Sequence, residues 1–239
     1  MMPKGDGKKP VDDKPRFFGR RRGKTLRRTA QGLMETLLPR LAIVPPGQGE
    51  PCLDVAALFP RPIQAVWLEV GFGGGEHVAA QARLYPDIGI IGCEPFNNGI
   101  ASLLGHLAGS DIDNVRIFPD DVRQLLPGLP QGSIGRAFVL FPDPWPKKRH
   151  AERRFIGKDN LDALAQVLAD GAELRVASDD PVYQDWAAEQ LRAHVDFTEV
   201  QVTSDRATLP DDWPPTRYEQ KCLARRDPVF FRFIRKNRV

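Results

Sequence analysis

Short apolar runs alternate with helix-patterned stretches through the middle of the chain, and this alternation constrains the fold more than any other feature. The runs predict strands over residues 65–70, 88–93, 115–118, 135–141 and 172–177. Helical stretches are expected up to about Tyr85 and over residues 96–107, 158–169 and 181–193. Strands that alternate with helices pair in parallel, because each connection crosses back over the sheet.

The C-terminal part of the chain departs from this alternation. Residues 197–202 and 229–234 alternate as antiparallel strands do, with no helix between them. We therefore expect an α/β fold: a Rossmann-like, doubly wound, mostly parallel seven-stranded sheet with an antiparallel terminal strand pair and a basic N-terminal extension. Residues 1–28 form the largely disordered extension, and residues 29–239 form one domain. This strand arrangement occurs in Rossmann-like methyltransferases, an analogy of fold that does not establish chemistry.

At the start of the domain, leucines recur at helical spacing at positions 33, 37 and 41, although Pro39 limits the length of that helix.

Charge is concentrated at the two ends. Residues 1–28 contain eleven Lys and Arg against three Asp, and residues 217–239 contain eight against two acids, while the whole chain carries only +3. The region between is therefore strongly acidic. Basic ends on an acidic domain favour a polyanionic partner held by the ends.

The composition excludes several classes. No run of about 18 apolar residues could span a membrane, and the basic N-terminus lacks the apolar segment of a signal peptide. The three cysteines are far apart, which predicts neither a metal site nor a disulfide framework. We expect a cytoplasmic protein with no bound metal.

A glycine-rich loop and a series of carboxylates follow the first four strands. In doubly wound sheets, ligands bind beyond the carboxyl ends of the strands, so these residues should share one rim. The predicted cofactor-binding residues are Glu69, Gly71, Gly73, Glu94, Asp121 and Asp143.

This acidic rim favours one cofactor over another. Glu76 stands where a dinucleotide site would place a pyrophosphate, which disfavours an NAD-dependent oxidoreductase. Carboxylates suit a ligand that carries positive charge and free ribose hydroxyls, and S-adenosylmethionine has both. Glu94 is placed for the ribose and Asp121 for the adenine, whereas His77 is expected to be an ordinary helix-face residue.

A proline-stiffened loop, FPDPWPKKRH, leaves the fourth strand at residues 141–150. Asp143 and Trp145 would be held there as a carboxylate and a ring for a purine. The basic residues that follow suit phosphates: Lys147, Lys148, Arg149, Arg153 and Arg154. Amine methyltransferases of nucleic acids have a similar loop, so the methyl acceptor could also be an exocyclic base amine or a protein side chain. A non-catalytic RNA-binding module is a further alternative.

The sequence resembles the bacterial tRNA (guanine-N7-)-methyltransferase family from about Phe18 to the C-terminus. The motifs are LEVGFGGGEH (68–77), GCEP (92–95), DDVRQLLP (120–127), FPDPWPKKRHAERR (141–154), ASDDPVY (177–183) and PTRYEQK (215–221). Arg217 and Tyr218 replace a commoner Lys and Phe, and Glu152 replaces a basic residue.

The resemblance implies methyl transfer from S-adenosylmethionine to N7 of guanine 46 in the tRNA variable loop. It implies Asp143 as the catalytic residue and tRNA as the partner. We expect no obligatory protein partner. The implied substrate contacts are Lys147, Asp179, Thr216, Arg217, Tyr218 and Glu219.

Overall fold

The computed structural model describes residues 17–47, 49–216 and 227–238. A seven-stranded sheet forms the centre, in the order β3-β2-β1-β4-β5-β7-β6. The strands are β1 (Ala65–Val70), β2 (Ile88–Cys93), β3 (Val115–Phe118), β4 (Ile134–Leu140), β5 (Leu168–Ser178), β6 (Phe197–Thr203) and β7 (Val229–Arg235). Strands β1 to β5 pair in parallel, while β7 runs antiparallel to both β5 and β6. The predicted doubly wound sheet with its antiparallel terminal pair is confirmed.

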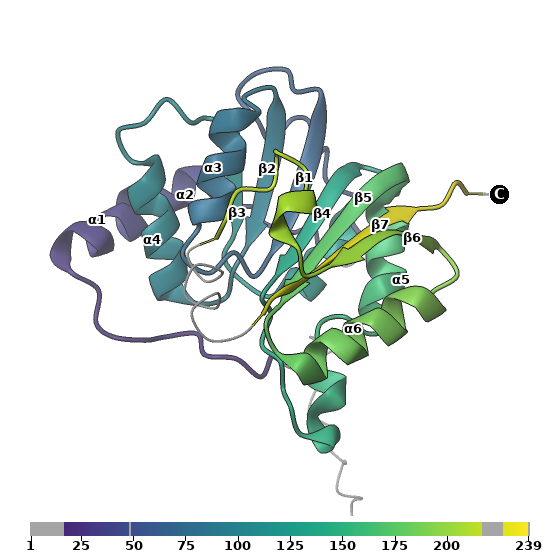
Figure 1. Cartoon of the computed structure of the whole chain (residues 1–239). Helices are drawn as coiled ribbons and strands as arrows, with labels where there is room; N and C mark the ends of the chain where they lie inside the picture. The colour runs from purple at the N-terminus through teal and green to yellow at the C-terminus, as the bar shows by residue number, and fades with distance from the viewer. Residues whose placement is uncertain (1–16, 48, 217–226, 239) are drawn as a thin grey trace, which may run out of the picture.

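Helices cover both faces of the sheet. They are α1 (Arg28–Thr36), α2 (Leu38–Leu41), α3 (Glu76–Leu84), α4 (Asn97–Leu107), α5 (Lys158–Val167) and α6 (Pro181–Ala193). Short 3-10 turns are η1 (Val122–Gln124), η2 (Leu126–Gly128), η3 (Lys148–Arg153) and η4 (Arg206–Thr208). Helices α1, α3 and α4 gather around β2 and β3, and α5 and α6 lie on the side of β6 and β7 (Figure 1). No helix in the described part of the chain is long and apolar enough to cross a membrane.

The two faces of the sheet are packed differently. On one face, α5 and α6 bury the main apolar core against β1, β4, β5 and β7 through residues such as Leu164 and Leu191. On the other face, α3 and α4 cover β2 and β3. The rest of that face is covered by the segment 204–216, whose Trp213 packs edge-on against Phe230 in a cluster that also contains Phe138. Residues just before the predicted substrate motif are thus built into the sheet's core.

The predicted leucine-spaced helix divides in two, and Pro39 explains the division. Helix α1 ends at Thr36, and α2 begins at Leu38 with the proline in its first turn. A proline is tolerated there because the first N–H groups of a helix have no intrahelical partner. The leucines at 33, 37 and 41 pack against the same core cluster as α3 and α4, as their spacing predicted.

Part of the basic N-terminal extension lies against the domain. The Gly23 backbone N–H donates to Asn98 Oδ1 at 3.0 Å, and Asn98 Nδ2 donates to the Lys24 carbonyl at 2.8 Å. Arg21 forms an ion pair with Asp120 at 2.7 Å. These contacts carry residues 17–24 along the carboxyl-end rim of the sheet. Residues 1–16 lie outside the described residues.

Candidate active site

A cavity of about 640 Å³ opens at the carboxyl ends of β1 to β4. It brings together five of the six predicted cofactor residues, Gly71, Gly73, Glu94, Asp121 and Asp143. The first residues of the described chain, Phe17 to Arg20, line another wall of the same cavity. The sequence indicated residues 1–28 only as a basic extension for a polyanionic partner and did not place Phe17 or Phe18 at a cavity.

The glycine loop between β1 and α3 requires its glycines for two reasons. Gly71, Gly73 and Gly75 have φ values of +67°, +56° and +80°, a region that side chains other than glycine rarely adopt. A Cβ on Gly75 would also lie 2.5 Å from Leu103 Cβ. The loop therefore turns sharply and lets α4 approach. Open space at Gly71 and Gly73 leaves their backbone accessible to a ligand.

Glu94, at the end of β2, is buried but faces the cavity. Its two carboxylate oxygens accept from the backbone N–H groups of Gly73 at 2.8 Å and Phe96 at 2.9 Å. Burial raises the pKa of Glu94, and the nearby charges of Asp143 and Glu69 raise it as well, whereas the two hydrogen bonds lower it. The resulting pKa is about 7. Each oxygen keeps a lone pair, so the carboxylate can accept from two further donors such as ribose hydroxyls.

Asp121, after β3, is held in a different way. It caps η1 by accepting from the Arg123 backbone N–H at 3.1 Å, and the Arg123 guanidinium lies against both of its oxygens. The paired carboxylate offers a hydrogen-bond acceptor with its charge compensated. That arrangement suits the neutral edge of a base better than a cation.

The proline-rich loop after β4 is strained and internally braced. Phe141 and Trp145 have φ values of +52° and +42°, which are unusual for residues other than glycine. Buried Arg154 donates to the carbonyls of Pro144 at 3.2 Å and Trp145 at 3.1 Å. These bonds hold the loop in place, and they leave the Asp143 side chain exposed at the cavity with no hydrogen-bond partner among the described residues.

The basic residues after this loop divide into two groups, contrary to the expectation that all five serve phosphates. Arg154 is buried and stacks on Trp186, with its guanidinium 4.9 Å from the ring centre. Arg153 lies over the rings of Phe18 and Trp145, at 4.5 and 5.1 Å. These two arginines support the loop and the N-terminal segment.

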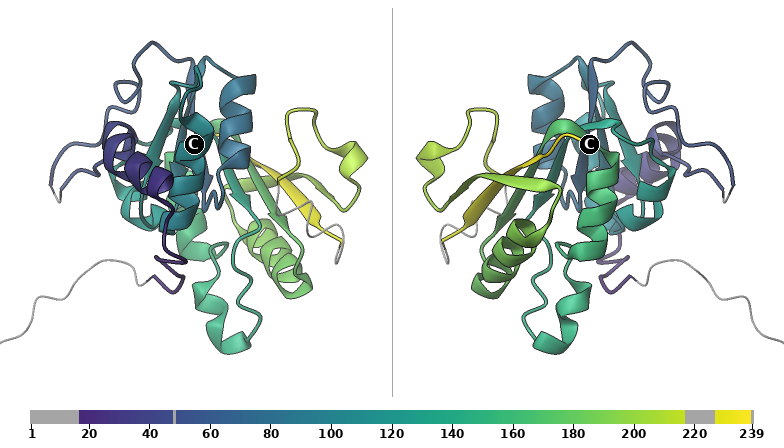
Figure 2. Two further views of the ribbon diagram at one scale, coloured as in Figure 1. Left: turned by 90° about the vertical axis from the view of Figure 1, so that its left-hand side faces the viewer. Right: turned by 90° about the vertical axis from the view of Figure 1, so that its right-hand side faces the viewer.

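The remaining basic side chains, Lys147, Lys148 and Arg149, are exposed and form no ion pair within the described part of the chain. They lie on the segment between β4 and α5 that protrudes from the body of the protein (Figure 2).

A second cavity, of about 330 Å³, adjoins the first and shares Gly71, Gly73 and Phe141 with it. Glu69 and Thr216 line the second cavity, together with His77 and the loop glycines. The sixth predicted cofactor residue, Glu69, therefore lies next to the first cavity and lines the same cavity as a predicted substrate residue. His77 belongs to α3, as predicted; it is buried and its Nδ1 lies 2.6 Å from Glu69 Oε2, a contact that the sequence did not indicate.

Two further predicted substrate residues, Lys147 and Asp179, lie on other parts of the described structure. Lys147 is exposed on the protruding segment, and Asp179 directly follows β5 at the rim. Neither lines a cavity. Arg217, Tyr218 and Glu219 lie outside the described residues.

Known proteins resemble the chain in both sequence and fold. A family model described as "Putative methyltransferase" matches residues 63–232. A tRNA (guanine-N(7)-)-methyltransferase of Paramagnetospirillum magneticum is 61% identical over 95% of both chains. The enzyme of that name from Rhodospirillum rubrum is 50% identical, over 97% of this chain and 91% of its own.

Among solved structures, the 16S rRNA methyltransferase KamB superposes with a TM-score of 0.54 at 17% identity, over 73% of this chain and 89% of its own. A 16S rRNA (adenine(1408)-N(1))-methyltransferase of Catenulisporales acidiphilia, solved with the cosubstrate SAM, gives 0.52 at 14% identity, over 73% and 87%. These two show the shared fold alone. The family model and the sequence relatives establish that the chain belongs to the tRNA (guanine-N(7)-)-methyltransferases.

Proposed function

We propose that the protein transfers a methyl group from S-adenosylmethionine to N7 of guanine 46 in the variable loop of tRNA. The observation that carries this proposal is the meeting of two features at one cavity: the carboxylates beyond β2 and β3, and the braced loop that presents Asp143. The names of the sequence relatives support the same base and atom. The position within the tRNA follows from the family resemblance.

The residues of the first cavity fit S-adenosylmethionine. Glu94 retains lone pairs for the two ribose hydroxyls, and the Arg123-paired Asp121 offers an acceptor for the adenine. Gly71 and Gly73 leave room for a ligand to approach the backbone. Glu69, in the adjoining cavity, supplies a carboxylate for a positively charged group. When bound, the cofactor supplies an activated methyl group, and the protein's task is alignment.

Asp143 acts on the guanine as an orienting and electrostatic residue. N7 already carries a lone pair, so its attack requires no general base, in contrast with an exocyclic amine. The attack places positive charge on the guanine ring, and a carboxylate beside the ring stabilises that charge as it develops. Asp143 can also accept from N1–H or from the exocyclic amine. Because no described residue bonds to Asp143, its carboxylate is available for this contact.

The exposed basic residues of the protruding segment would bind the tRNA backbone. Lys147, Lys148 and Arg149 form no ion pair with the described residues and follow directly after the loop that holds Asp143. Extruding a guanine from a folded tRNA costs a few kcal/mol, which contacts to phosphates can offset. Thr216 and Asp179 are proposed as further substrate contacts, with Arg217, Tyr218 and Glu219.

The experiment that tests this function is a methyl-transfer assay with labelled S-adenosylmethionine and unmodified tRNA, followed by nucleoside analysis. We expect 7-methylguanosine, and we expect its loss when the tRNA carries adenine at position 46. Label in another nucleoside would contradict the proposed acceptor. Cofactor binding without any transfer to tRNA would retain the cofactor assignment and direct the search to another acceptor or a missing partner.

A further inference from the structure

A buried chain of polar groups links Glu69 to the segment that carries Thr216. Glu69 Oε2 lies 2.6 Å from His77 Nδ1, and His77 Nε2 lies 3.3 Å from Gln81 Nε2. Gln81 Nε2 also donates to the backbone carbonyl of Asp212 at 2.8 Å. The side chains of Glu69, His77 and Gln81 are almost fully buried, with residue exposures of 3%, 4% and 1%.

The direction of these hydrogen bonds follows from one backbone carbonyl. The carbonyl of Asp212 only accepts, so the Gln81 group that faces it must be the NH₂ group. The same NH₂ group faces His77 Nε2, which must then be the acceptor. Nδ1 therefore carries the imidazole hydrogen and donates a hydrogen bond to Glu69 Oε2.

Asp212 is fixed to the sheet, so the far end of the chain of hydrogen bonds is rigid. Its carboxylate accepts from Arg136 of β4 at 2.6 Å and from Arg175 of β5 at 2.7 Å. The next residue, Trp213, is buried, and the Arg175 guanidinium lies 5.2 Å from its ring centre. Thr216 follows three residues later and lines the same cavity as Glu69. The polar chain therefore connects two walls of this cavity.

Glu69 is left with one carboxylate oxygen for a ligand. Oε2 is occupied by His77, and no described residue bonds to Oε1, while Glu69 lines the second cavity. A carboxylate with one fixed oxygen presents the other in a defined direction.

We propose that His77 and Gln81 are positioning residues that orient the Glu69 carboxylate and fix it relative to the segment 209–216. The inference rests on the proposed function, because it gives Glu69 a role toward the positively charged cofactor and gives the segment a role toward the tRNA. Neither His77 nor Gln81 touches the reacting atoms. Their effect passes through Glu69 on one side and through the Asp212 backbone on the other.

Three variants and one control test this relay, the hydrogen-bonded chain that runs from Glu69 through His77 and Gln81 to Asp212. His77→Phe removes the donor to Glu69, and we expect the cofactor Kd to rise about tenfold, since a hydrogen bond to a charged group has this order of effect. His77→Asn places an amide N–H near the position of Nδ1 and should restore most of the affinity. Gln81→Leu breaks the link to Asp212 and should raise KM for tRNA as well as the cofactor Kd, each by about threefold or more.

The matched control is Asn114→Ala. Asn114 is equally buried and donates to the carbonyls of Ala82, Tyr85 and Ile88, away from both cavities. Its loss should lower thermal stability and leave the cofactor Kd unchanged. Thermal melting of all four variants separates loss of folding from loss of positioning.

Equilibrium titration with S-adenosylmethionine gives the decisive readout without turnover. An unchanged cofactor Kd in His77→Phe, or equal loss in His77→Phe and His77→Asn, would overturn the proposal. The wild-type protein reports separately on the proposed function. If it methylates tRNA and the His77 variants bind the cofactor normally, only the relay fails. If it binds the cofactor without methylating tRNA, the function fails and the titration still tests the relay.

Discussion

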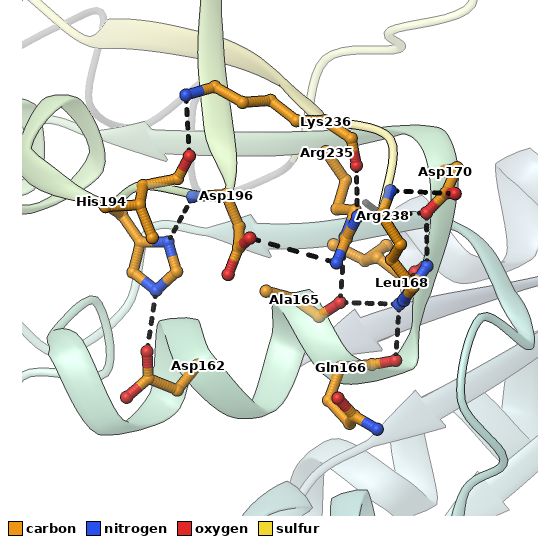
Figure 3. A network of polar contacts seen from close by, with 11 residues as sticks. Asp162, Ala165, Gln166, Leu168, Asp170, His194, Asp196, Arg235, Lys236 and Arg238 are labelled. Carbon is orange, nitrogen blue, oxygen red and sulfur yellow. Dashed lines mark hydrogen bonds and ion pairs between the residues drawn. The ribbon is translucent and has the colours of Figure 1, made fainter.

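Two charged regions of this protein differ in how far their charges are paired. One is the rim at the carboxyl ends of the strands, and the other is the cluster of charged residues near the C-terminus. In the C-terminal cluster (Figure 3), Asp170 accepts from Arg235 at 3.0 Å and also pairs with Arg238. The Arg238 backbone N–H and guanidinium lower the pKa of Asp170. Arg238 also donates to the carbonyls of Ala165 and Gln166 in the last turn of α5 and of Leu168 just after it. The charges of Asp170, Arg235 and Arg238 are thus paired with one another.

Two carboxylates of the rim lack such a countercharge, although Asp121 pairs with Arg123. Glu94 is held by two backbone N–H groups and no cation, and burial raises its pKa to about 7. Asp143 has no partner in the described part of the chain. Paired charges hold the chain in place, whereas carboxylates without a countercharge destabilise the free protein and become favourable when a positively charged ligand arrives. The comparison predicts that changes at the rim affect ligands and changes at the cluster affect folding.

The largest effect should come from Asp143→Asn. The amide keeps the shape and removes the negative charge that stabilises the methylated guanine. We expect kcat to fall about 100-fold or more, as for other groups that stabilise transition-state charge. The cofactor Kd should change far less. Single-turnover rates and cofactor titrations give the two quantities.

The matched control for that variant is Asp111→Asn, an exposed aspartate remote from both cavities, which should leave kcat unchanged. Equal losses in kcat and cofactor affinity for Asp143→Asn would assign the residue to cofactor binding instead of to the guanine.

The pH dependence of Glu94 should give the next effect. Its folded pKa of about 7 exceeds the ordinary value of 4.5, so the folded protein keeps a proton that the unfolded chain has lost between these pH values. The stability contribution of Glu94 is therefore lost as pH rises from about 4.5 to 7, by at most about 1.4 kcal/mol per pH unit. Unfolding titrations of wild type and Glu94→Gln should diverge across this window.

Cofactor binding should show the opposite trend at the same residue. Ionised Glu94 accepts from the ribose hydroxyls and favours a cation nearby, so wild-type affinity should rise with pH between about 6 and 8. Glu94→Gln should flatten that profile. A profile that stays steep in Glu94→Gln would place the titrating group elsewhere.

Arg238→Met should lower the stability of the fold without changing ligand affinity. The variant removes the guanidinium that pairs with Asp170 and caps the carbonyls at the C-terminal end of α5. We expect a loss of about 1–3 kcal/mol in the free energy of unfolding. Chemical denaturation measures it, and the cofactor Kd should not change. Arg40→Met, at an exposed arginine of α2, is the control and should have little effect on either. A cofactor Kd that weakens in Arg238→Met would break the distinction between the two regions.

Sequence periodicity was sufficient for the fold because parallel strands and amphipathic helices are local patterns. The strand predicted at 115–118 and the helix predicted at 181–193 match β3 and α6. The strand predicted at 172–177 was too short: β5 begins at Leu168, where α5 has just ended, and Leu168 pairs with Ile134 before an irregularity in the register. Helical and extended patterns overlap at that junction, so periodicity alone does not separate them.

The rim was predictable in outline, because the topology carries the ends of neighbouring strands to one edge. The direction of each side chain was not. Arg154 follows three exposed basic residues closely, yet it turns inward to bind the carbonyls of Pro144 and Trp145. His77 was predicted only as a helix-face residue, and its contact with Glu69 is seen in the structure alone. Both depend on tertiary contacts that no local pattern records.

The smallest effect should come from the exposed cations of the protruding segment. Lys148→Ala removes one charge that the described structure leaves unpaired, and we expect KM for tRNA to rise a few-fold. The dependence of log KM on log salt should become shallower by about 0.7–0.9, the contribution of one phosphate contact. Lys158→Ala is the control, because Lys158 already pairs with Asp162 at 2.6 Å on α5. Removal of a lysine that already forms an ion pair within the protein should leave the dependence of log KM on log salt unchanged. If Lys158→Ala altered the slope as much as Lys148→Ala, pairing within the protein would not decide which cations reach the tRNA.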